Sequence, residues 1–275
     1  MFTKRHIPGT LLAGLLLTAS LSFGPQAMAD TALAPVRVIL VGDSTMTNKS
    51  GYGLGFCAQF RPEVTCVNAA RGGRSSKSYR VEGLWDAVMK QVADGKAYQA
   101  TYVLIQFGHN DGSPKPERHT SLETEFPVNM RGYVRDTIKA GGVPVLVTPI
   151  TQRHFRNGRL LPDLLPWAVA TRLVAASEHT ALIDLNAESQ RAIQAMGLAE
   201  ANTLAGQPIP QNVLETQESG TSVPAVFTDA SQGSSEVTQA FDYTHTGPKG
   251  SAYFGKMVAK LLIQAEPKLT PYLKP

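Results

Sequence analysis

Residues 36–41 (VRVILV) form a run of strand length that is almost wholly apolar and ends at a glycine turn. A continuous apolar run of this kind is typical of a strand that is buried on both faces of a parallel sheet. Further runs of strand length lie at 64–68, 102–107, 143–147 and 181–185. Segments with helical spacing lie between and after them, at 55–60, 83–93, 122–140, 164–179 and 248–265. This alternation predicts an α/β chain with a five-stranded, mainly parallel sheet that helices cover on both sides.

The first 29 residues have the three parts of a secretory signal peptide. Lys4 and Arg5 are basic, residues 7–23 are apolar, and an A-x-A cleavage site follows at 27–29. The alternative for this segment is a membrane anchor. Three features count against an anchor: an internal proline, internal glycines, and the small residues at the end of the apolar run. We therefore expect an exported protein, periplasmic or extracellular, whose mature chain is a single domain over residues 30–275 with no membrane attachment.

Cys57 and Cys66 are the two cysteines of the chain. In an oxidising compartment, an even number of cysteines favours a disulfide between them. The alternative is a pair of buried thiols. Because no histidine stands near these cysteines, they do not make a zinc site, and we expect no metal.

One segment breaks the alternation of strands and helices. Residues 205–240 show no clear periodicity, are rich in Gly, Pro, Ser, Thr and Gln, and hold four acidic residues and no basic one. A stretch of this length without repeating elements is usually a functional loop or disordered. We therefore expect a long polar insertion in the single domain.

Polar residues follow the predicted strands at the edge where open parallel sheets bind ligands. Ser44 follows the first strand, Gly73 the second and Asn110 the third, and Asp242 and His245 precede the last helix. Acyl transfer needs a hydroxyl nucleophile, a histidine base, a carboxylate that orients the base, and donors for the oxyanion. Ser44, His245 and Asp242 fit the first three roles, and the amides of Ser44, Gly73 and Asn110 fit the last. Singly these blocks are ordinary turn and capping chemistry; together, in this order, they favour an esterase.

The four blocks resemble the SGNH (GDSL) hydrolase superfamily. They are Gly42-Asp43-Ser44, the glycine block around Gly73, Gly108-His109-Asn110-Asp111, and Asp242-Tyr243-Thr244-His245. The sequences GDSTM, GRSSKSY followed by EG, FGHNDG and D-x-THT resemble the rhamnogalacturonan acetylesterase branch. The resemblance implies a flavodoxin-like three-layer α/β/α sandwich and a serine esterase that uses no cofactor. It implies Ser44 as nucleophile, His245 as base and Asp242 as the orienting carboxylate, with Ser44, Gly73 and Asn110 as the oxyanion donors.

The charged residues give a weaker indication of the substrate. The formal charge of +4 falls to +2 once Lys4 and Arg5 are removed, and no basic stripe is interleaved with aromatic residues, so no nucleic-acid partner is expected. Arg74 lies beside the glycine block, and Arg153 and His154 follow the fourth strand. Arginine pairs well with carboxylates, so these three residues are predicted to bind an acidic sugar. The alternative is a solvated, slightly basic rim.

These features favour a monomeric, exported carbohydrate deacetylase that acts on an acetylated polysaccharide or oligosaccharide, pectic rhamnogalacturonan in particular. Two alternatives stay open. One is an exported lipolytic esterase or thioesterase with the same triad, which a greasy acyl pocket would favour. The other is a non-catalytic carbohydrate-binding module, against which the presence of all three triad residues argues.

Overall fold

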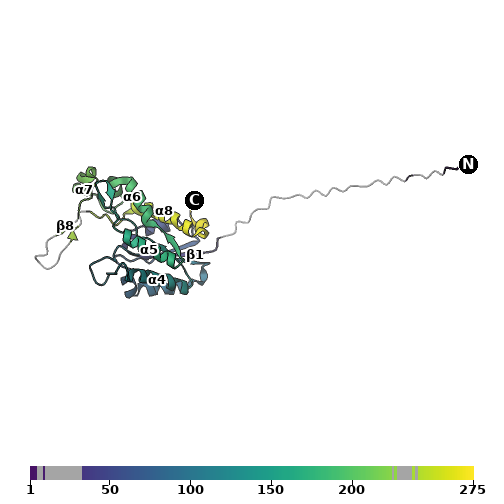
Figure 1. Ribbon diagram of the computed structural model, residues 1–275, viewed down its shortest axis with the longest axis horizontal. Coiled ribbons are helices and arrows are strands. Elements are labelled where there is room, and N and C mark those ends of the chain that lie inside the picture. Colours follow the sequence, from purple (N-terminus) through teal and green to yellow (C-terminus); the bar gives the residue numbers. More distant parts are fainter. Residues whose placement is uncertain (5–8, 10–32, 225, 228–236, 239–240) are drawn as a thin grey trace. The chain divides into compact units, whose positions relative to one another are not determined.

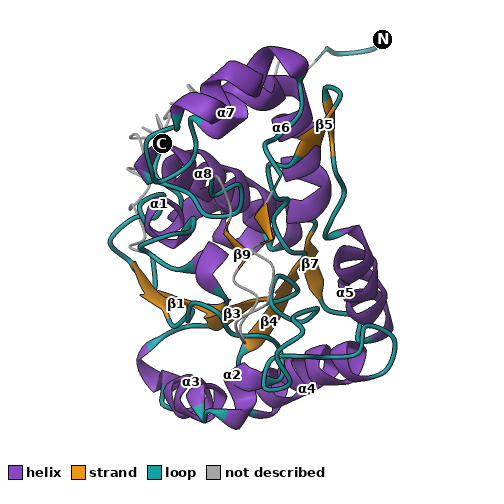
Figure 2. Cartoon of the chain, turned by 90° about the vertical axis from the view of Figure 1, so that its left-hand side faces the viewer, coloured by secondary structure: helices purple, strands orange, loops and turns teal. Residues whose placement is uncertain are grey.

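Five parallel strands form the central sheet of the computed structural model, which describes residues 1–4, 9, 33–224, 226–227, 237–238 and 241–275. The strands are β1 Val36–Gly42, β2 Val64–Asn68, β3 Thr101–Gln106, β4 Val143–Val147 and β7 Ala181–Ile183. Their spatial order is β2-β1-β3-β4-β7 (Figure 2). The chain passes from β1 to β2 on one side of β1, and then crosses to β3 on the other side and continues outward to β7. The order of the strands therefore reverses between β1 and β3. In sheets of this flavodoxin-like order, the crevice at the carboxyl ends of those two strands is where ligands bind.

Helices cover both faces of this sheet and make three layers (Figure 2). The helices are α1 Gly53–Cys57, α2 Ser78–Val81, α3 Leu84–Ala93, α4 Glu125–Lys139, α5 Leu165–Ser177, α6 Leu185–Asn202 and α8 Pro248–Ala265. Alternate side chains of β1 divide between two cores. Val38 and Leu40 pack with α1, α6 and α8, whereas Ile39 and Val41 pack with α2, α3, α4 and α5. The predicted α/β/α sandwich is therefore confirmed.

The described residues of Leu33–Pro275 belong to one compact unit. The expected signal peptide, residues 1–29, lies almost entirely outside the described residues (Figure 1). None of the helices that the structure describes is both long and apolar enough to cross a membrane.

The fifth strand is shorter than the sequence predicts, because a helix begins where the apolar run continues. The strand ends at Ile183, and Asp184 caps α6 by accepting a hydrogen bond from the amide of Ala187. The Asp184 carboxylate is also held by two hydrogen bonds from the Arg172 guanidinium, both 2.9 Å long. Leu185, predicted as the last strand residue, is the first residue of a helix that the sequence analysis did not predict.

The described part of residues 205–240 contains regular structure. It holds the helix α7 Gln211–Thr216, the 3₁₀ helix η3 Gln217–Ser219 and the short antiparallel pair β8 Val226–Phe227 and β9 Val237–Thr238. Val213 of α7 is buried against Phe241 and Tyr243. The hairpin β5 Phe155–Arg156 and β6 Arg159–Leu160 follows β4, and the carbonyl of Phe155 accepts from the amide of Ser222 over 2.9 Å. The start and middle of this polar stretch therefore pack onto the domain.

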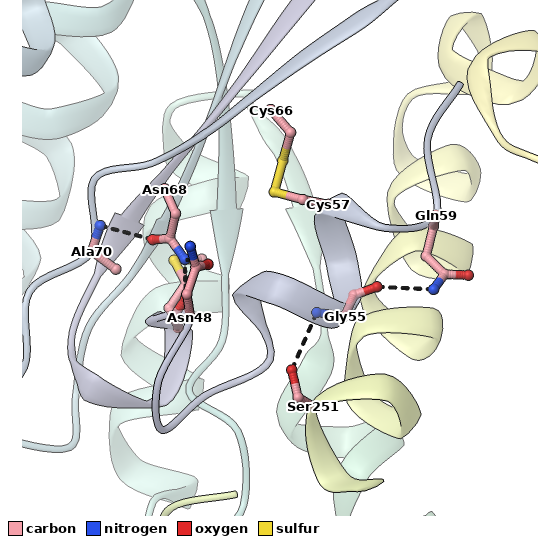
Figure 3. Close-up of a disulfide and its surroundings, with 9 residues drawn as sticks. Asn48, Gly55, Cys57, Gln59, Cys66, Asn68, Ala70 and Ser251 are labelled. Carbon is pink, nitrogen blue, oxygen red and sulfur yellow. Dashed lines mark hydrogen bonds between the residues drawn. A yellow bond between two sulfur atoms is a disulfide. The ribbon is translucent and has the colours of Figure 1, made fainter. Parts of the chain in front are cut away.

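Glycines allow α1 and α8 to meet backbone against backbone. A Cβ atom on Gly55 would fall on the carbonyl group of Ser251, and one on Gly255 would fall on the backbone of Gly55. The amide of Gly55 donates to the Ser251 hydroxyl over 3.2 Å (Figure 3). The loop after β1 leads into α1, and a second loop leads into α8. The two loops are joined by a 3.0 Å bond from the Thr246 amide to the Ser50 carbonyl.

A disulfide between Cys57 and Cys66 ties α1 to β2, so the predicted pairing is confirmed (Figure 3). The two cysteines are nine residues apart, and closing a loop of that size stabilises a fold by about 2–3 kcal/mol in the chain-entropy model. The helix that packs against α8 is thus also anchored to the edge strand of the sheet.

Replacing Gly255 with alanine should destabilise the protein by about 1–3 kcal/mol, the usual cost of overpacking. The added methyl group would force the two helix backbones apart. Urea unfolding curves of the variant and the wild type measure the difference. Leu54→Ala is the control, because Leu54 lies in α1 but is 60% exposed, and its replacement should change stability by less than about 0.5 kcal/mol. An unchanged unfolding midpoint for Gly255→Ala would show that the close contact is not required.

Candidate active site

The structure brings Ser44, His245 and Asp242 into one hydrogen-bonded chain. The Ser44 hydroxyl lies 2.7 Å from Nε2 of His245, and Nδ1 of His245 lies 2.8 Å from Oδ2 of Asp242. Because a carboxylate can only accept, Nδ1 carries the hydrogen and Nε2 presents its lone pair to the hydroxyl. Ser44 and His245 are 201 residues apart in the chain. The imidazole is thus positioned to take a proton from a serine that lies at the far end of the sequence.

Asp242 organises the loop that carries this imidazole. Its Oδ1 accepts hydrogen bonds from the amides of Thr244, at 2.9 Å, and of His245, at 2.8 Å. Partial burial raises the pKa of the Asp242 carboxyl, but the hydrogen bonds from His245 and Thr244 outweigh burial and hold that pKa well below its usual range. The hydrogen bond to Asp242 raises the pKa of His245, although burial opposes the rise. The carboxylate is therefore charged throughout the pH range in which His245 titrates.

Ser44 is held by a buried carboxylate that precedes it in the chain. Ser44 begins the 3₁₀ helix η1 Ser44–Met46, and Asp43 caps it by accepting from the amide of Thr45, at 2.9 Å, and from its hydroxyl, at 2.7 Å. The other oxygen of Asp43 lies 3.2 Å from Nδ1 of His109, whose Nε2 lies 3.0 Å from the carbonyl oxygen of Ile150. Burial raises the pKa of Asp43, but His109 and Thr45 more than offset this and lower it. One carboxylate thus joins the loop after β1 to the loop after β3.

The predicted oxyanion donors Ser44, Gly73 and Asn110 follow the strands β1, β2 and β3 in the chain. Gly73 has a φ of 77°, which a side chain would strain, and a Cβ on the adjacent Gly72 would lie 3.7 Å from Cβ of Ser44. Asn110 donates one amide hydrogen to the carbonyl of Arg74 over 3.1 Å, which fixes the orientation of its side chain. Within the described part of the chain, neither the Ser44 amide nor the Gly73 amide donates to a protein acceptor. Both donors therefore remain for a ligand.

A cavity of about 370 Å³ contains the triad. The sequence analysis missed three of its lining residues, Gln152, Gln207 and Phe241. Gln207 lies in the stretch without periodicity, where no pattern marks one glutamine above another. Gln152 donates to the hydroxyl of Thr244 over 3.0 Å, a contact that only the fold creates. Phe241 is the exception, since its position directly before Asp242 is a usable signal. The cavity is lined by Ser44, His109, Asn110, Gln152, Gln207, Phe241, Asp242, Thr244 and His245.

Arg74 and His154, two of the predicted substrate residues, are engaged outside this cavity. The guanidinium of Arg74 forms an ion pair with Glu82 at 2.8 Å and donates to the carbonyl of Gly72, also at 2.8 Å. Nδ1 of His154 lies 3.0 Å from a carboxylate oxygen of Asp163, and His154 lines a separate cavity of about 400 Å³. The contact of either residue with a substrate stays a prediction.

The prediction that Arg153 binds substrate is wrong. Its side chain is only 1% exposed. The guanidinium donates to the backbone carbonyls of Asp242, Thr244 and His245, at 2.8, 3.3 and 2.8 Å. Arg153 therefore packs behind the loop that carries the triad residues, and its charge does not face the cavity.

The arrangement has the parts that acyl transfer needs. A serine is paired with a base, and the base is paired with a carboxylate. Asn110, whose side-chain amide can donate to an oxyanion, lines the same cavity. Among the described residues, no group of three or more His, Cys, Asp and Glu side chains could hold a metal ion. The chemistry that this geometry supports is nucleophilic attack on an ester by Ser44.

Comparison with known proteins finds relatives that carry the name rhamnogalacturonan acetylesterase. No protein-family model matches the chain. It is 32% identical over 160 residues to probable rhamnogalacturonan acetylesterase YesY of Bacillus subtilis, a match that covers 56% of this chain and 71% of that protein. It is also 32% identical over 178 residues to rhamnogalacturonan acetylesterase RhgT of the same organism, covering 62% and 73%. The solved structure of Bacillus subtilis YxiM matches 85% of this chain and 56% of that one, with a TM-score of 0.58 at 21% identity, which shows a shared fold.

Replacing Asp43 with asparagine should lower the free energy of unfolding at pH 7 by about 1.5–3 kcal/mol, the usual contribution of hydrogen bonds to a charged group. The change removes the buried carboxylate that accepts from Thr45 and contacts His109. The folded-state pKa of Asp43 is below the ordinary value of 3.8, so the stabilisation is complete above that pH and is lost as the pH falls through the folded-state value. The gap between variant and wild type should therefore be largest near neutral pH and narrow below about pH 4.

Urea unfolding at pH 7 and at pH 3 measures this gap. The control is Asp94→Asn, at an exposed carboxylate whose side chain makes no capping hydrogen bond. A pH-independent difference for Asp43→Asn would contradict the charged state of that carboxyl.

Proposed function

Because the chain belongs to the rhamnogalacturonan acetylesterase family, within the SGNH hydrolase superfamily, we propose that it is an exported serine esterase that removes acetyl groups from rhamnogalacturonan. The observation that carries the proposal is the hydrogen-bonded chain from Ser44 through His245 to Asp242. Ser44 is the nucleophile, His245 the general base and acid, and Asp242 the carboxylate that orients the imidazole.

The reaction proceeds in two acyl transfers. His245 takes the proton of the Ser44 hydroxyl as the oxygen attacks the acetyl carbonyl carbon. The tetrahedral intermediate collapses when His245 gives that proton to the departing sugar oxygen, and an acetyl group remains on Ser44. A water molecule then attacks the acetyl-enzyme, again losing its proton to His245. The proton returns to Ser44 as acetate leaves, so the enzyme is regenerated.

The oxyanion of each tetrahedral intermediate is stabilised by the amides of Ser44, Gly73 and Asn110. The side-chain amide of Asn110 is held by the Arg74 carbonyl, so it does not have to reorient during the reaction. Loss of one such donor typically costs about 2.7–4 kcal/mol of transition-state stabilisation.

The cavity favours a sugar over a lipid as the alcohol side of the ester. Its lining has hydroxyl, amide and imidazole groups, and the aromatic ring of Phe241 is its apolar member. A lipolytic esterase needs a wide apolar wall for a long acyl chain, whereas a sugar binds mainly through hydrogen bonds to its hydroxyl groups. Export through the 1–29 segment is part of the proposal, and the Cys57–Cys66 disulfide supports it because disulfides persist in oxidising compartments.

Acetylated rhamnogalacturonan should release acetate with the wild-type protein, and Ser44→Ala should reduce the rate by about 10⁴-fold or more. A small half-buried hydroxyl contributes little to the core, so the variant should keep the wild-type circular dichroism spectrum and melting temperature. Released acetate is measured for this polymer, for acetylated xylan and for a long-chain acyl ester. Faster hydrolysis of the long-chain ester would favour the lipolytic alternative, and a fully active Ser44→Ala protein would exclude the serine mechanism.

Replacing Asp242 with asparagine should lower kcat by about 10⁴-fold, because the imidazole loses the partner that fixes its tautomer. The carboxylate raises the pKa of His245, and the base must be neutral to act, so wild-type kcat/KM falls as the pH drops below that raised value. The residual activity of Asp242→Asn should therefore persist to lower pH than that of the wild type. The matched control is Asp163→Asn, which breaks an aspartate–histidine contact outside the cavity, with His154, and should leave both quantities unchanged. If kcat/KM of Asp242→Asn fell at the same acidic pH as that of the wild type, the pairing of Asp242 with His245 would be contradicted.

A further inference from the structure

Arg153 is a cation enclosed behind the loop that carries the base. Burial lowers its pKa to about 10, and the negative charge of Asp242 opposes that drop. Its Nη2 donates to two carbonyls, those of Asp242 and His245, and its Nη1 to that of Thr244. Its Nε finds no acceptor among the described residues. Among the described residues, the guanidinium is therefore bound by backbone carbonyls of the loop and not by a carboxylate.

Two peptide groups lie between Arg153 and the Asp242 carboxylate. The peptide between Thr244 and His245 accepts from the Arg153 guanidinium at its carbonyl and donates to Oδ1 of Asp242 at its amide. The peptide between Tyr243 and Thr244 accepts at its carbonyl from the backbone amide of Arg153, at 2.9 Å, and donates to the same carboxylate oxygen. The first peptide dipole therefore points from the buried cation to the carboxylate, and the second points from the Arg153 backbone to it, so that each hydrogen bond polarises the next.

We propose that Arg153 is the positioning residue of the catalytic loop, which fixes the Asp242 carboxylate and the His245 imidazole through the peptide groups between them. The inference rests on the proposed function, because the role of Arg153 depends on the proposed catalytic roles of Asp242 and His245. Removing the guanidinium would leave three buried carbonyls without donors and allow the loop to turn, which would lengthen the path from the imidazole to Ser44. Misplacing a catalytic group by about 1 Å can cost about 10²-fold in rate.

The same cation also influences the protonation of the base. The hydrogen bond to Asp242 raises the pKa of His245, burial lowers it, the charges of Asp242 and Asp43 raise it further, and the charge of Arg153 lowers it. His109 lines the same cavity. A neutral residue in place of Arg153 removes a positive charge that disfavours the imidazolium, so the pKa of His245 should rise.

The test compares Arg153→Met with Arg153→Lys. The first variant removes the charge and the donors, and the second keeps the charge but loses the planar set of guanidinium N–H donors. Arg156→Met is the matched control, because Arg156 is an exposed arginine three residues along. Two measurements are made on each folded protein. The first is kcat and KM for a small neutral acetyl ester, and the second is the titration of the His245 imidazole by NMR.

We expect Arg153→Met to lower kcat about 10²-fold with an unchanged KM and to raise the pKa of His245. Arg153→Lys should recover part of kcat and titrate like the wild type, and Arg156→Met should match the wild type in both measurements. A wild-type kcat in Arg153→Met, or a His245 titration that does not move in that variant, would overturn the proposal.

If Arg153→Met does not fold, Arg153→Lys decides. A reduced kcat with the wild-type titration then supports positioning, and a wild-type kcat overturns it. The NMR titration does not depend on turnover, so a failure of the proposed function, seen as an active Ser44→Ala protein, is distinguishable from a failure of this inference.

Discussion

The backbone contact between α1 and α8 is the constraint on which the site depends. The sheet delivers Ser44 and Asn110 at the ends of neighbouring strands, but His245 lies on no strand and reaches Ser44 only because its loop leads into α8. Gly55 and Gly255 let the two helices approach until no side chain separates them. The disulfide from Cys57 to β2 anchors α1 to the sheet at the other side. The positions of Ser44 and His245 relative to each other are therefore set by the packing of α1 against α8 rather than by the sheet.

Buried charges stabilise each of the two loops that meet at the Ser44–His245 hydrogen bond. On one side, Asp43 is fully enclosed and holds the turn at Ser44 while it contacts His109. On the other side, Arg153 is enclosed and holds the backbone whose amides bind Asp242. Burying an ion is costly, so the net gain in stability from each charge is small, even though removing it from the finished structure leaves its partners unsatisfied and destabilises the fold. Their value here is geometric, because each fixes one loop in a single conformation.

The sequence predicted the strands, the helices α3, α4, α5 and α8, and the residues of the Ser44–His245–Asp242 hydrogen-bonded chain, because these depend on local patterns or on motif order. The buried strand at 36–41 shows its burial in its own composition, and Ser44 and His245 stand in recognisable blocks. Arg153 was assigned to the surface because arginines are rarely enclosed, and nothing in the chain shows that three carbonyls of a distant loop would meet it. Helix α6 was missed because Asp184, its cap, follows an apolar run that favours a strand. Gln207 was missed because a segment without periodicity gives no basis for choosing one residue.

The 201-residue separation between Ser44 and His245 has a consequence for biosynthesis. A ribosome exposes β1 and its serine early, yet α8 and the loop before it emerge only after nearly all of this domain has been made. Contacts between such distant segments form late and slow the folding of a chain. Ser44 has no contact with His245 until α8 and the loop before it are in place. The hydrogen-bonded chain of the site can therefore form only after nearly the whole domain has been made.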